Sequence, residues 1–218
     1  MKKYNTIIFD LDGTLLNTLE DLTDSVNYAL GLYGYQKRSI EEVRRFLGNG
    51  VGKLMEIVVP DGLNNPLYKK CLESFKNHYS DNIRNKTMPY KGIMELIQQL
   101  KKENYKIAVV SNKFDKAVKE LVRDFFGEYI QVAIGEAENI SRKPAPDTVF
   151  KALEELQSLR EKTIYVGDSE VDVKTAKNAG IKCVGVTWGF RDRDVLEKEG
   201  ADYIIDESME LMEIIDSV

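Results

Sequence analysis

The amino-acid sequence predicts an α/β protein in which a Rossmann-like parallel sheet carries an inserted α-helical domain. Strand-like and helical segments alternate from residue 89 to the C-terminal end, a pattern typical of a parallel sheet with right-handed crossovers. Residues 18–84, in contrast, have helical patterns throughout and follow one short strand. We therefore expect residues 1–16 and 87–218 to form the α/β core and residues 17–86 to form the inserted domain.

The first strand and the inserted helices have recognisable apolar patterns. Residues 4–9 are a short β-rich run that stops at the turn beginning with Asp10. Apolar residues at helical spacing predict one helix near residues 19–33 and another near residues 67–79. Between them, Ser39 and Glu42 have the spacing of a capping box that begins a helix, and residues 48–50 separate this helix from another over residues 51–59.

The remaining segments supply the alternating elements of the core. Apolar residues three and four positions apart indicate the helices, and short β-rich runs indicate the strands. In chain order we expect a helix near 93–100, a strand over 105–110, a helix near 118–125, a strand over 132–134, a helix over 146–156, a strand over 163–166, a helix over 171–179, a strand over 181–186, a short helix near 195, a strand over 203–205 and a last helix near 211.

Composition excludes several classes of protein. The 218 residues have a formal net charge of −5, which disfavours a nucleic-acid-binding role. No apolar run approaches the ~20 residues of a membrane helix, and we expect no signal peptide. Cys71 and Cys183 form no pair motif, which favours a reducing cytoplasm. His78 is the single histidine, so multi-histidine metal sites are excluded; we expect it to be partly buried and structural.

Polar residues follow the predicted strands, where open parallel sheets bind ligands. These residues are Asp10, Asp12 and Thr14 after the first strand, Ser111 and Asn112 after the strand over 105–110, Lys143 in the loop before residue 146, and Asp168 and Asp172 after the strand over 163–166. Taken singly, each motif is typical of a turn, a helix cap or a solvated loop. Their joint occurrence, in order along the chain, favours phosphoryl transfer instead.

The residue types suit that chemistry. Carboxylates without histidine form an oxygen-only site, which selects Mg²⁺. A carboxylate can also attack a phosphate and form an aspartyl-phosphate. Repulsion between two such charges amounts to about 4 kcal/mol at about 4 Å and an effective dielectric constant of ~20. A compensating positive charge is therefore needed, which Mg²⁺ and a lysine can supply.

Four motifs relate the chain to a known family: Asp10-Leu11-Asp12-Gly13-Thr14, Ser111-Asn112, Lys143-Pro144 and Gly167-Asp168-Ser169-Glu170-Val171-Asp172. With them, the chain resembles haloacid dehalogenase superfamily phosphatases with a helical cap over essentially its full length. Residues 89–92, 111–113 and 185–191 are especially similar to bacterial phosphoglycolate phosphatases. The resemblance implies the haloacid dehalogenase fold, with the inserted domain as the cap.

The resemblance also implies roles for individual residues. Asp10 would be the nucleophile and a magnesium ligand, and Asp12 the general acid and then base, with its main-chain carbonyl on the metal. Asp168 would complete the metal site, while Asp172 would act from outside it or through water. The residues implied to hold the phosphoryl group are Thr14, Ser111, Asn112 and Lys143. Dehalogenases lack the second carboxylate of the first motif, so Asp12 favours a phosphatase or phosphomutase.

The insert contains candidates for substrate specificity. Residues 36–53 hold five basic and two acidic residues within an acidic chain. The break at residues 48–50 precedes a helix whose free N–H groups could meet an anion. We expect Lys37 and Arg38 to be solvated, whereas Asn49, Gly50 and Lys53 are candidates for binding a second anionic group of the substrate.

We therefore predict a cytoplasmic, Mg²⁺-dependent phosphatase that hydrolyses a small phosphorylated metabolite, best matched by 2-phosphoglycolate, through an aspartyl-phosphate. A phosphomutase similar to β-phosphoglucomutase and a pyrophosphatase are alternatives within the superfamily. A non-catalytic protein that binds a phosphate ligand is the alternative from another class. We expect neither a nucleic-acid nor a membrane partner, and a monomer or a weak homodimer.

Overall fold

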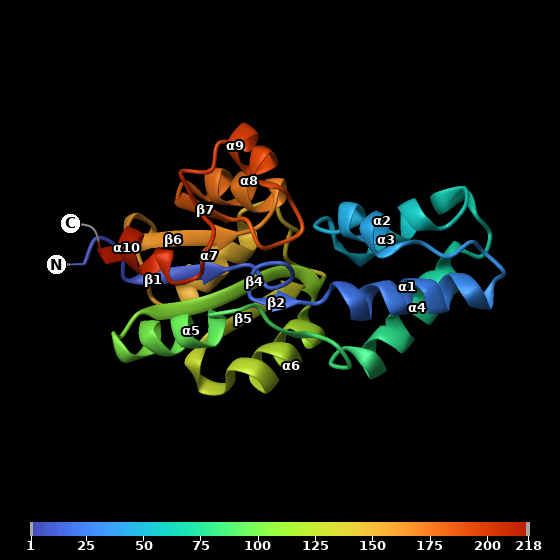
Figure 1. Cartoon of the computed structure of the whole chain (residues 1–218), viewed down its shortest axis with the longest axis horizontal. Helices are drawn as coiled ribbons and strands as arrows, with labels where there is room; N and C mark the ends of the chain where they lie inside the picture. Colours follow the sequence, from blue (N-terminus) through green and yellow to red (C-terminus); the bar gives the residue numbers. More distant parts are fainter. Residues whose placement is uncertain (1, 217–218) are drawn as a thin grey trace. The chain divides into compact units, whose positions relative to one another are not determined.

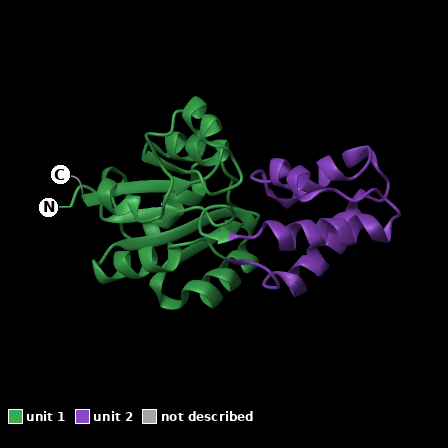
Figure 2. Cartoon of the chain, viewed as in Figure 1, with its two compact units in different colours: residues 1–16, 89–218 green, residues 17–88 purple. Residues whose placement is uncertain are grey.

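The computed structural model describes residues 2–216, and the chain divides into two compact units. Figure 2 shows one unit built from the residues up to Leu16 together with those from Pro89 onward, and a second unit, Asn17–Met88. The chain enters the second unit after Leu16 and returns to the first unit after Met88. The return point lies two residues beyond the limit expected from the sequence. Both crossings lie in short strands, β2 (Leu16–Asn17) and β3 (Met88–Pro89), which pair as a two-stranded sheet.

The first unit is built on a six-stranded sheet. Its strands are β1 (Thr6–Phe9), β4 (Lys106–Phe114), β5 (Val132–Glu136), β6 (Thr163–Gly167), β7 (Lys182–Val186) and β8 (Tyr203–Ile205). They lie in the order β5-β4-β1-β6-β7-β8, and each neighbouring pair is parallel. This architecture confirms the predicted α/β fold class with a parallel sheet.

Helices precede or follow the strands of this sheet. They are α5 (Ile93–Lys102), α6 (Asp115–Phe126), α7 (Asp147–Glu155), α8 (Glu170–Ala179), α9 (Arg193–Glu199) and α10 (Glu210–Asp216). In Figure 1, α5 and α6 run below β4 and β5, while α8 and α9 lie above β6 and β7. Apolar residues of α7 and α8 pack with strand residues such as Ile8, Ala108 and Tyr165 in one continuous core.

The strand order places the end of β1 at the centre of one edge of the sheet. From β1 the chain builds β4 and β5 on one side, and then returns to build β6, β7 and β8 on the other side. Parallel α/β sheets bind ligands beyond the carboxyl ends of their strands at such a reversal of strand order. Thr6 of β1 pairs with both Lys106 and Thr163, so both flanking strands run in step with β1. Strand β6 ends beside β1, whereas β4 continues beyond it to Phe114.

The predicted strand boundary that differs most from the structure is the end of β4. The strand expected over residues 105–110 continues to Phe114, with an irregular register between Val110 and Phe114. Ser111, Asn112 and Lys113 therefore lie within β4 rather than after it. Polar residues favour a strand end when they need solvent, but these three are buried and hydrogen-bonded to protein groups, so the strand continues.

The second unit is helical, as predicted. It contains α1 (Leu19–Leu32), α2 (Ile40–Phe46), α3 (Gly50–Val58) and α4 (Tyr68–Asn82). Helices α1 and α4 pack against each other, and Phe75 and Tyr79 of α4 are fully buried. Helix α2 begins with the predicted capping box, in which Glu42 N–H donates to Ser39 Oγ and Ser39 N–H donates to Glu42.

His78 has the structural place expected of it. Its Nδ1 atom lies 3.0 Å from the Ser25 hydroxyl, and its ring stacks on Tyr28 with 4.0 Å between the ring centroids. Nearby, the buried Asp21 carboxylate accepts hydrogen bonds from the backbone N–H groups of Lys86 and Thr87, which fixes the segment that leads to β3. None of the helices in residues 2–216 is long and apolar enough to cross a membrane.

Candidate active site

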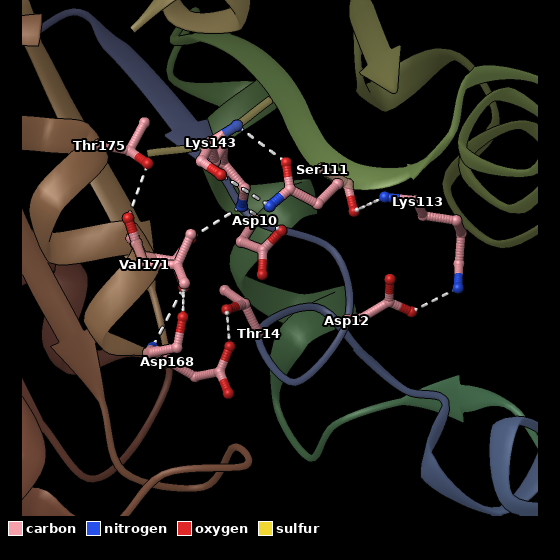
Figure 3. Close-up of polar contacts among 12 residues, drawn as sticks. Asp10, Asp12, Thr14, Ser111, Lys113, Lys143, Asp168, Val171 and Thr175 are labelled. Carbon is pink, nitrogen blue, oxygen red and sulfur yellow. Dashed lines mark hydrogen bonds and ion pairs between the residues drawn. The ribbon is translucent and has the colours of Figure 1, made fainter. Parts of the chain in front are cut away.

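Asp10 and Lys143 form a buried ion pair beyond the carboxyl end of β1. The Lys143 Nζ atom donates to Asp10 Oδ1 at 2.7 Å. Asp10 directly follows β1, and its backbone N–H donates to the carbonyl of Val166 in β6, which fixes the start of the loop. Lys143 comes from the loop between β5 and α7. Two of the predicted site residues, far apart in the sequence, thus meet at the predicted edge (Figure 3).

Asn112 holds the loop that carries Lys143. The Asn112 amide donates to the Lys143 carbonyl at 3.0 Å, and the backbone N–H of Lys143 donates to Asn112 Oδ1 at 2.9 Å. A side chain that pairs both backbone groups of one residue fixes that residue's position closely. This pairing of Asn112 with the Lys143 backbone was not expected from the sequence. The expected contact between Asn112 and a phosphoryl group stays a prediction.

Asp168 lies immediately after β6 and is held by groups on two other loops. Thr14 Oγ1 donates to Asp168 Oδ1 at 3.1 Å, and the backbone N–H of Phe190 donates to Oδ2 at 2.7 Å. Gly13, with φ of +88°, lies against this carboxylate, and a Cβ at residue 13 would come within 3.0 Å of it. Because Gly13 has no side chain and adopts a left-handed conformation, the loop after β1 can approach Asp168 closely.

Asp172, in the first turn of α8, is fully buried and pairs with Lys143. Its Oδ1 atom accepts from Lys143 Nζ at 2.8 Å, and its Oδ2 atom accepts from the Ser169 hydroxyl at 2.6 Å. Tyr165 of β6 also donates to Oδ1, at 3.0 Å. Lys143 thus lies between two carboxylates, those of Asp10 and Asp172.

Asp12 is directed away from this cluster. Its Oδ1 atom lies 2.9 Å from the Nζ atom of Lys113, which is almost completely buried, and Figure 3 shows the pair beside the Asp10 cluster rather than within it. The sequence pattern did not single out Lys113 as a functional residue. Ser111 accepts a hydrogen bond from the Lys113 backbone N–H, and the expected phosphoryl contacts of Ser111 and Thr14 stay predictions.

Burial and crowding of negative charge raise two carboxyl pKa values. Desolvation, together with the charges of Asp172 and Asp168, raises the pKa of Asp10 well above its usual range, although Lys143 opposes the shift. Desolvation and the charge of Asp172 raise the pKa of Asp168 to about 7. Burial lowers the pKa of Lys143, but attraction by Asp10 and Asp172 outweighs burial and raises it overall, so the lysine stays charged.

The carboxylate cluster fits a hard cation. Oxygen atoms of Asp10, Asp168 and Asp172 all lie within 4.8 Å of one another, and all three residues are buried. Oxygen-only ligands of this kind suit Mg²⁺. A bound cation would also reverse the charge crowding that raises the carboxyl pKa values. The donor set therefore fits the expected cofactor.

The specificity candidates Asn49, Gly50 and Lys53 belong to the helical unit. Asn49 precedes α3 without a side-chain cap, and Gly50 has φ of +80° at the start of the helix. Lys53 is half exposed and pairs with Glu56 at 2.8 Å. An exposed pair of this type contributes about 0–1 kcal/mol, so it leaves the lysine available to another anion.

Comparison with known proteins identifies the family. The family model of the haloacid dehalogenase-like hydrolases matches residues 7–186, a range that includes every core residue of the site. The chain belongs to this family. The assignment confirms the resemblance inferred from the four motifs and makes the protein a hydrolase.

Several relatives match this haloacid dehalogenase-like hydrolase over nearly its whole length. Pyrophosphatase PpaX of Bacillus mycoides is 31% identical, covering 99% of both chains. A phosphoglycolate phosphatase of Mesorhizobium japonicum is 33% identical over 88% of this chain and 87% of its own. A crystal structure of a candidate phosphoglycolate phosphatase from Lactobacillus delbrueckii superimposes with a TM-score of 0.94 at 35% identity, covering 99% of this chain and 100% of that one.

Proposed function

We propose that this hydrolase is a Mg²⁺-dependent phosphatase of small phosphorylated metabolites, with 2-phosphoglycolate as its substrate and Asp10 as its nucleophile. The observation that carries the proposal is the position of Asp10, whose carboxylate is 2.7 Å from a buried lysine and within a cluster of acidic groups that fits Mg²⁺. Relatives named phosphoglycolate phosphatase, about as similar as those named pyrophosphatase, support the substrate. We also propose that the protein is cytoplasmic, because its two cysteines are buried and form no disulfide.

The proposed ligands of Mg²⁺ are the carboxylates of Asp10 and Asp168 and the main-chain carbonyl of Asp12. Asp172 is proposed to act without binding the ion directly. When bound, the ion supplies positive charge that offsets repulsion between the nucleophile and the phosphate. Lys143 supplies a second positive charge beside Asp10, because its ammonium stays protonated between two carboxylates. Thr14, Ser111 and Asn112 are proposed to orient the phosphoryl oxygens.

The chemistry divides into two displacements at phosphorus. In the first, an Asp10 carboxylate oxygen bonds to phosphorus while the bond to the leaving oxygen breaks, and Asp12 donates a proton to that oxygen. In the second, Asp12 takes a proton from water as the water oxygen bonds to phosphorus, and the bond between phosphorus and the Asp10 oxygen breaks. This step releases inorganic phosphate and regenerates the Asp10 carboxylate. Asp12 pairs with Lys113 in the structure, so we infer that its side chain leaves Lys113, takes up a proton and turns toward the leaving oxygen.

The helical unit is proposed to select substrates with a second anionic group. Asn49, Gly50 and Lys53 lie at the start of α3, where backbone N–H groups have no partner within the helix. The Lys53 ammonium adds a positive charge to this helix start. Such a site favours phosphoglycolate, whose carboxylate is the second anion, over sugar phosphates with neutral hydroxyls.

A pyrophosphatase is the second candidate, because the named pyrophosphatase relative matches the full length at 31% identity. A panel of phosphate compounds, with release of inorganic phosphate and isomerisation of the sugar phosphates as the readouts, separates the candidates. The panel contains 2-phosphoglycolate, pyrophosphate, glucose 1-phosphate and glucose 6-phosphate. We expect the highest kcat/KM for 2-phosphoglycolate. Pyrophosphate in first place supports the second candidate, isomerised sugar phosphate without phosphate release indicates a mutase, and binding without turnover of any ester indicates a non-catalytic protein.

Two variants test the specificity candidates within the same panel. Lys53→Ala is expected to lower kcat/KM for 2-phosphoglycolate by about tenfold, with little change for glucose 6-phosphate, because one ion-pairing cation is lost. Lys37→Ala, an exposed lysine of the same unit, is the matched control and is expected to leave both values unchanged. Equal losses on both substrates for Lys53→Ala contradict the assignment.

A further inference from the structure

The Lys143 ammonium has a complete set of hydrogen-bond acceptors within the protein. Nζ donates to Asp10 Oδ1 at 2.7 Å, to Asp172 Oδ1 at 2.8 Å and to the Tyr165 hydroxyl at 3.1 Å. A lysine ammonium has three N–H donors, so three acceptors satisfy it fully. Tyr165 is the one uncharged member of this set.

The three acceptors come from separate parts of the fold. Asp10 follows β1, Tyr165 lies within β6, and Asp172 lies in α8. Fixing a long, flexible lysine side chain costs conformational entropy, which a rigid and complete set of acceptors can offset. Tyr165 is fully buried, and its ring packs in the core between the sheet and helices α7 and α8, so its hydroxyl has a fixed position.

The Tyr165 hydroxyl makes two linked contacts in this position. It accepts a hydrogen bond from Lys143 Nζ at 3.1 Å and donates one to Asp172 Oδ1 at 3.0 Å. Burial raises the pKa of this phenol well above its usual range, so the hydroxyl keeps the proton that it donates. Phenylalanine would fill the same core space without either contact.

We propose that Tyr165 is a positioning residue that fixes the Lys143 ammonium beside the Asp10 carboxylate. Its hydroxyl holds Nζ from the core side, while its bond to Asp172 fixes the second carboxylate that Lys143 contacts. Tyr165 therefore acts through Lys143 and makes no contact with substrate. The inference rests on the proposed catalytic role of Lys143, but it does not depend on which phosphate ester is the natural substrate.

The test compares Tyr165→Phe with wild type on the phosphate ester that the panel shows to be turned over fastest. Loss of a partner that orients a metal ligand typically lowers activity about 10- to 100-fold, and we expect a loss of the same order for a partner that orients a catalytic lysine. We expect kcat to fall within that range with KM within about twofold of wild type, because substrate contacts remain while the charge beside Asp10 is misplaced. Tyr105→Phe is the matched control, since Tyr105 is another buried tyrosine of this unit and donates to Asp216 at 2.8 Å, away from the site.

A normal kcat for Tyr165→Phe overturns the proposal, and so does an equal fall in kcat for Tyr105→Phe. A double-mutant cycle with Lys143→Met provides a second measurement. If Tyr165 acts through Lys143, Tyr165→Phe lowers the residual rate of Lys143→Met by less than about twofold. If instead Tyr165→Phe lowers kcat by the same factor in Lys143→Met as in wild type, the proposal is overturned. Lys143→Met alone with normal turnover shows instead that the proposed function of Lys143 fails.

Discussion

The Nζ atom of Lys143 lies 2.7 Å from Oδ1 of Asp10, although 133 positions of the sequence separate the two residues. The ion pair forms where the loop after β1 meets the loop that Asn112 holds from β4. It joins a positive charge to a carboxylate that is buried and surrounded by further acidic groups. A nucleophile that attacks an anionic phosphate needs such compensation of charge.

Replacement of Asp10, the proposed nucleophile, is expected to abolish turnover. Asp10→Asn keeps the size of the side chain but removes its negative charge, so kcat should fall by at least about a thousandfold. Beryllofluoride, which mimics a phosphoryl group on a carboxylate, should form an adduct with wild type but not with this variant, as measured by ¹⁹F NMR. Asp12→Asn is the control, because it retains Asp10 and should still form the adduct. An adduct on Asp10→Asn would show that another group is modified.

Removal of the lysine charge is expected to affect both activity and stability. Lys143→Met should lower kcat by about 100-fold or more, because the charge beside Asp10 is lost. It should also lower the free energy of unfolding by about 3 kcal/mol without Mg²⁺, because Asp10 and Asp172 lose their buried counter-charge. Lys182→Met is the control: it removes an exposed ion pair with Asp202 and should leave the stability measured in thermal melts nearly unchanged. A Lys143→Met protein with normal kcat would make the lysine purely structural.

Magnesium is expected to stabilise the protein more at high pH than at low pH. The pKa of Asp168 is raised from 3.8 to about 7, and a raised carboxyl pKa favours folding only while the group is protonated. Without Mg²⁺, stability should therefore fall as the pH rises from about 4 through about 7. Mg²⁺ binds the ionised carboxylate, so the increase in Tm on adding it should be larger at pH 8 than at pH 5. Asp168→Asn should weaken this pH dependence, and an equal Mg²⁺ effect at both pH values would contradict the metal assignment.

The close approach of two loops at Asp168 predicts strong sensitivity at Gly189. A Cβ on residue 189 would lie within 3.0 Å of the Asp168 side chain and of the Gly13 carbonyl. Gly189→Ala should therefore destabilise the protein by about 1–3 kcal/mol in denaturant unfolding and lower kcat by displacing Asp168. Gly31→Ala is the matched control, because Gly31 lies in α1 with nothing within 4 Å of the position that a Cβ would take, and should be stabilising by about 0.5–1 kcal/mol. Equal stability of the two variants would show that the loops can move apart freely.

The fold and the location of the site could be predicted from the sequence because both depend on local patterns. The alternation of strand-like and helical segments predicts a parallel sheet, and the carboxyl ends of parallel strands lie at one edge of it. Asp10, Lys143 and Asp168 could therefore be expected near one another from the order of strands and loops alone. Ser39 and Glu42 likewise predicted their own capping box, because every group in that motif lies within four residues.

The partners of the site residues depended on tertiary structure. A pattern of strands and loops does not say that Asn112 pairs with the Lys143 backbone, or that Asp12 lies beside Lys113. Tyr165 has the sequence pattern of an ordinary core residue, since its ring is apolar and lies in a buried strand. Its hydroxyl reaches Lys143 and Asp172 only because β6, α8 and the loop before α7 meet in space. The sequence by itself determined the fold class, the sheet edge and the residue types of the candidate site, because these follow from local periodicity and strand direction. Tertiary packing decided which side chains meet there, because contacts between distant segments depend on side-chain direction and burial rather than on spacing along the chain.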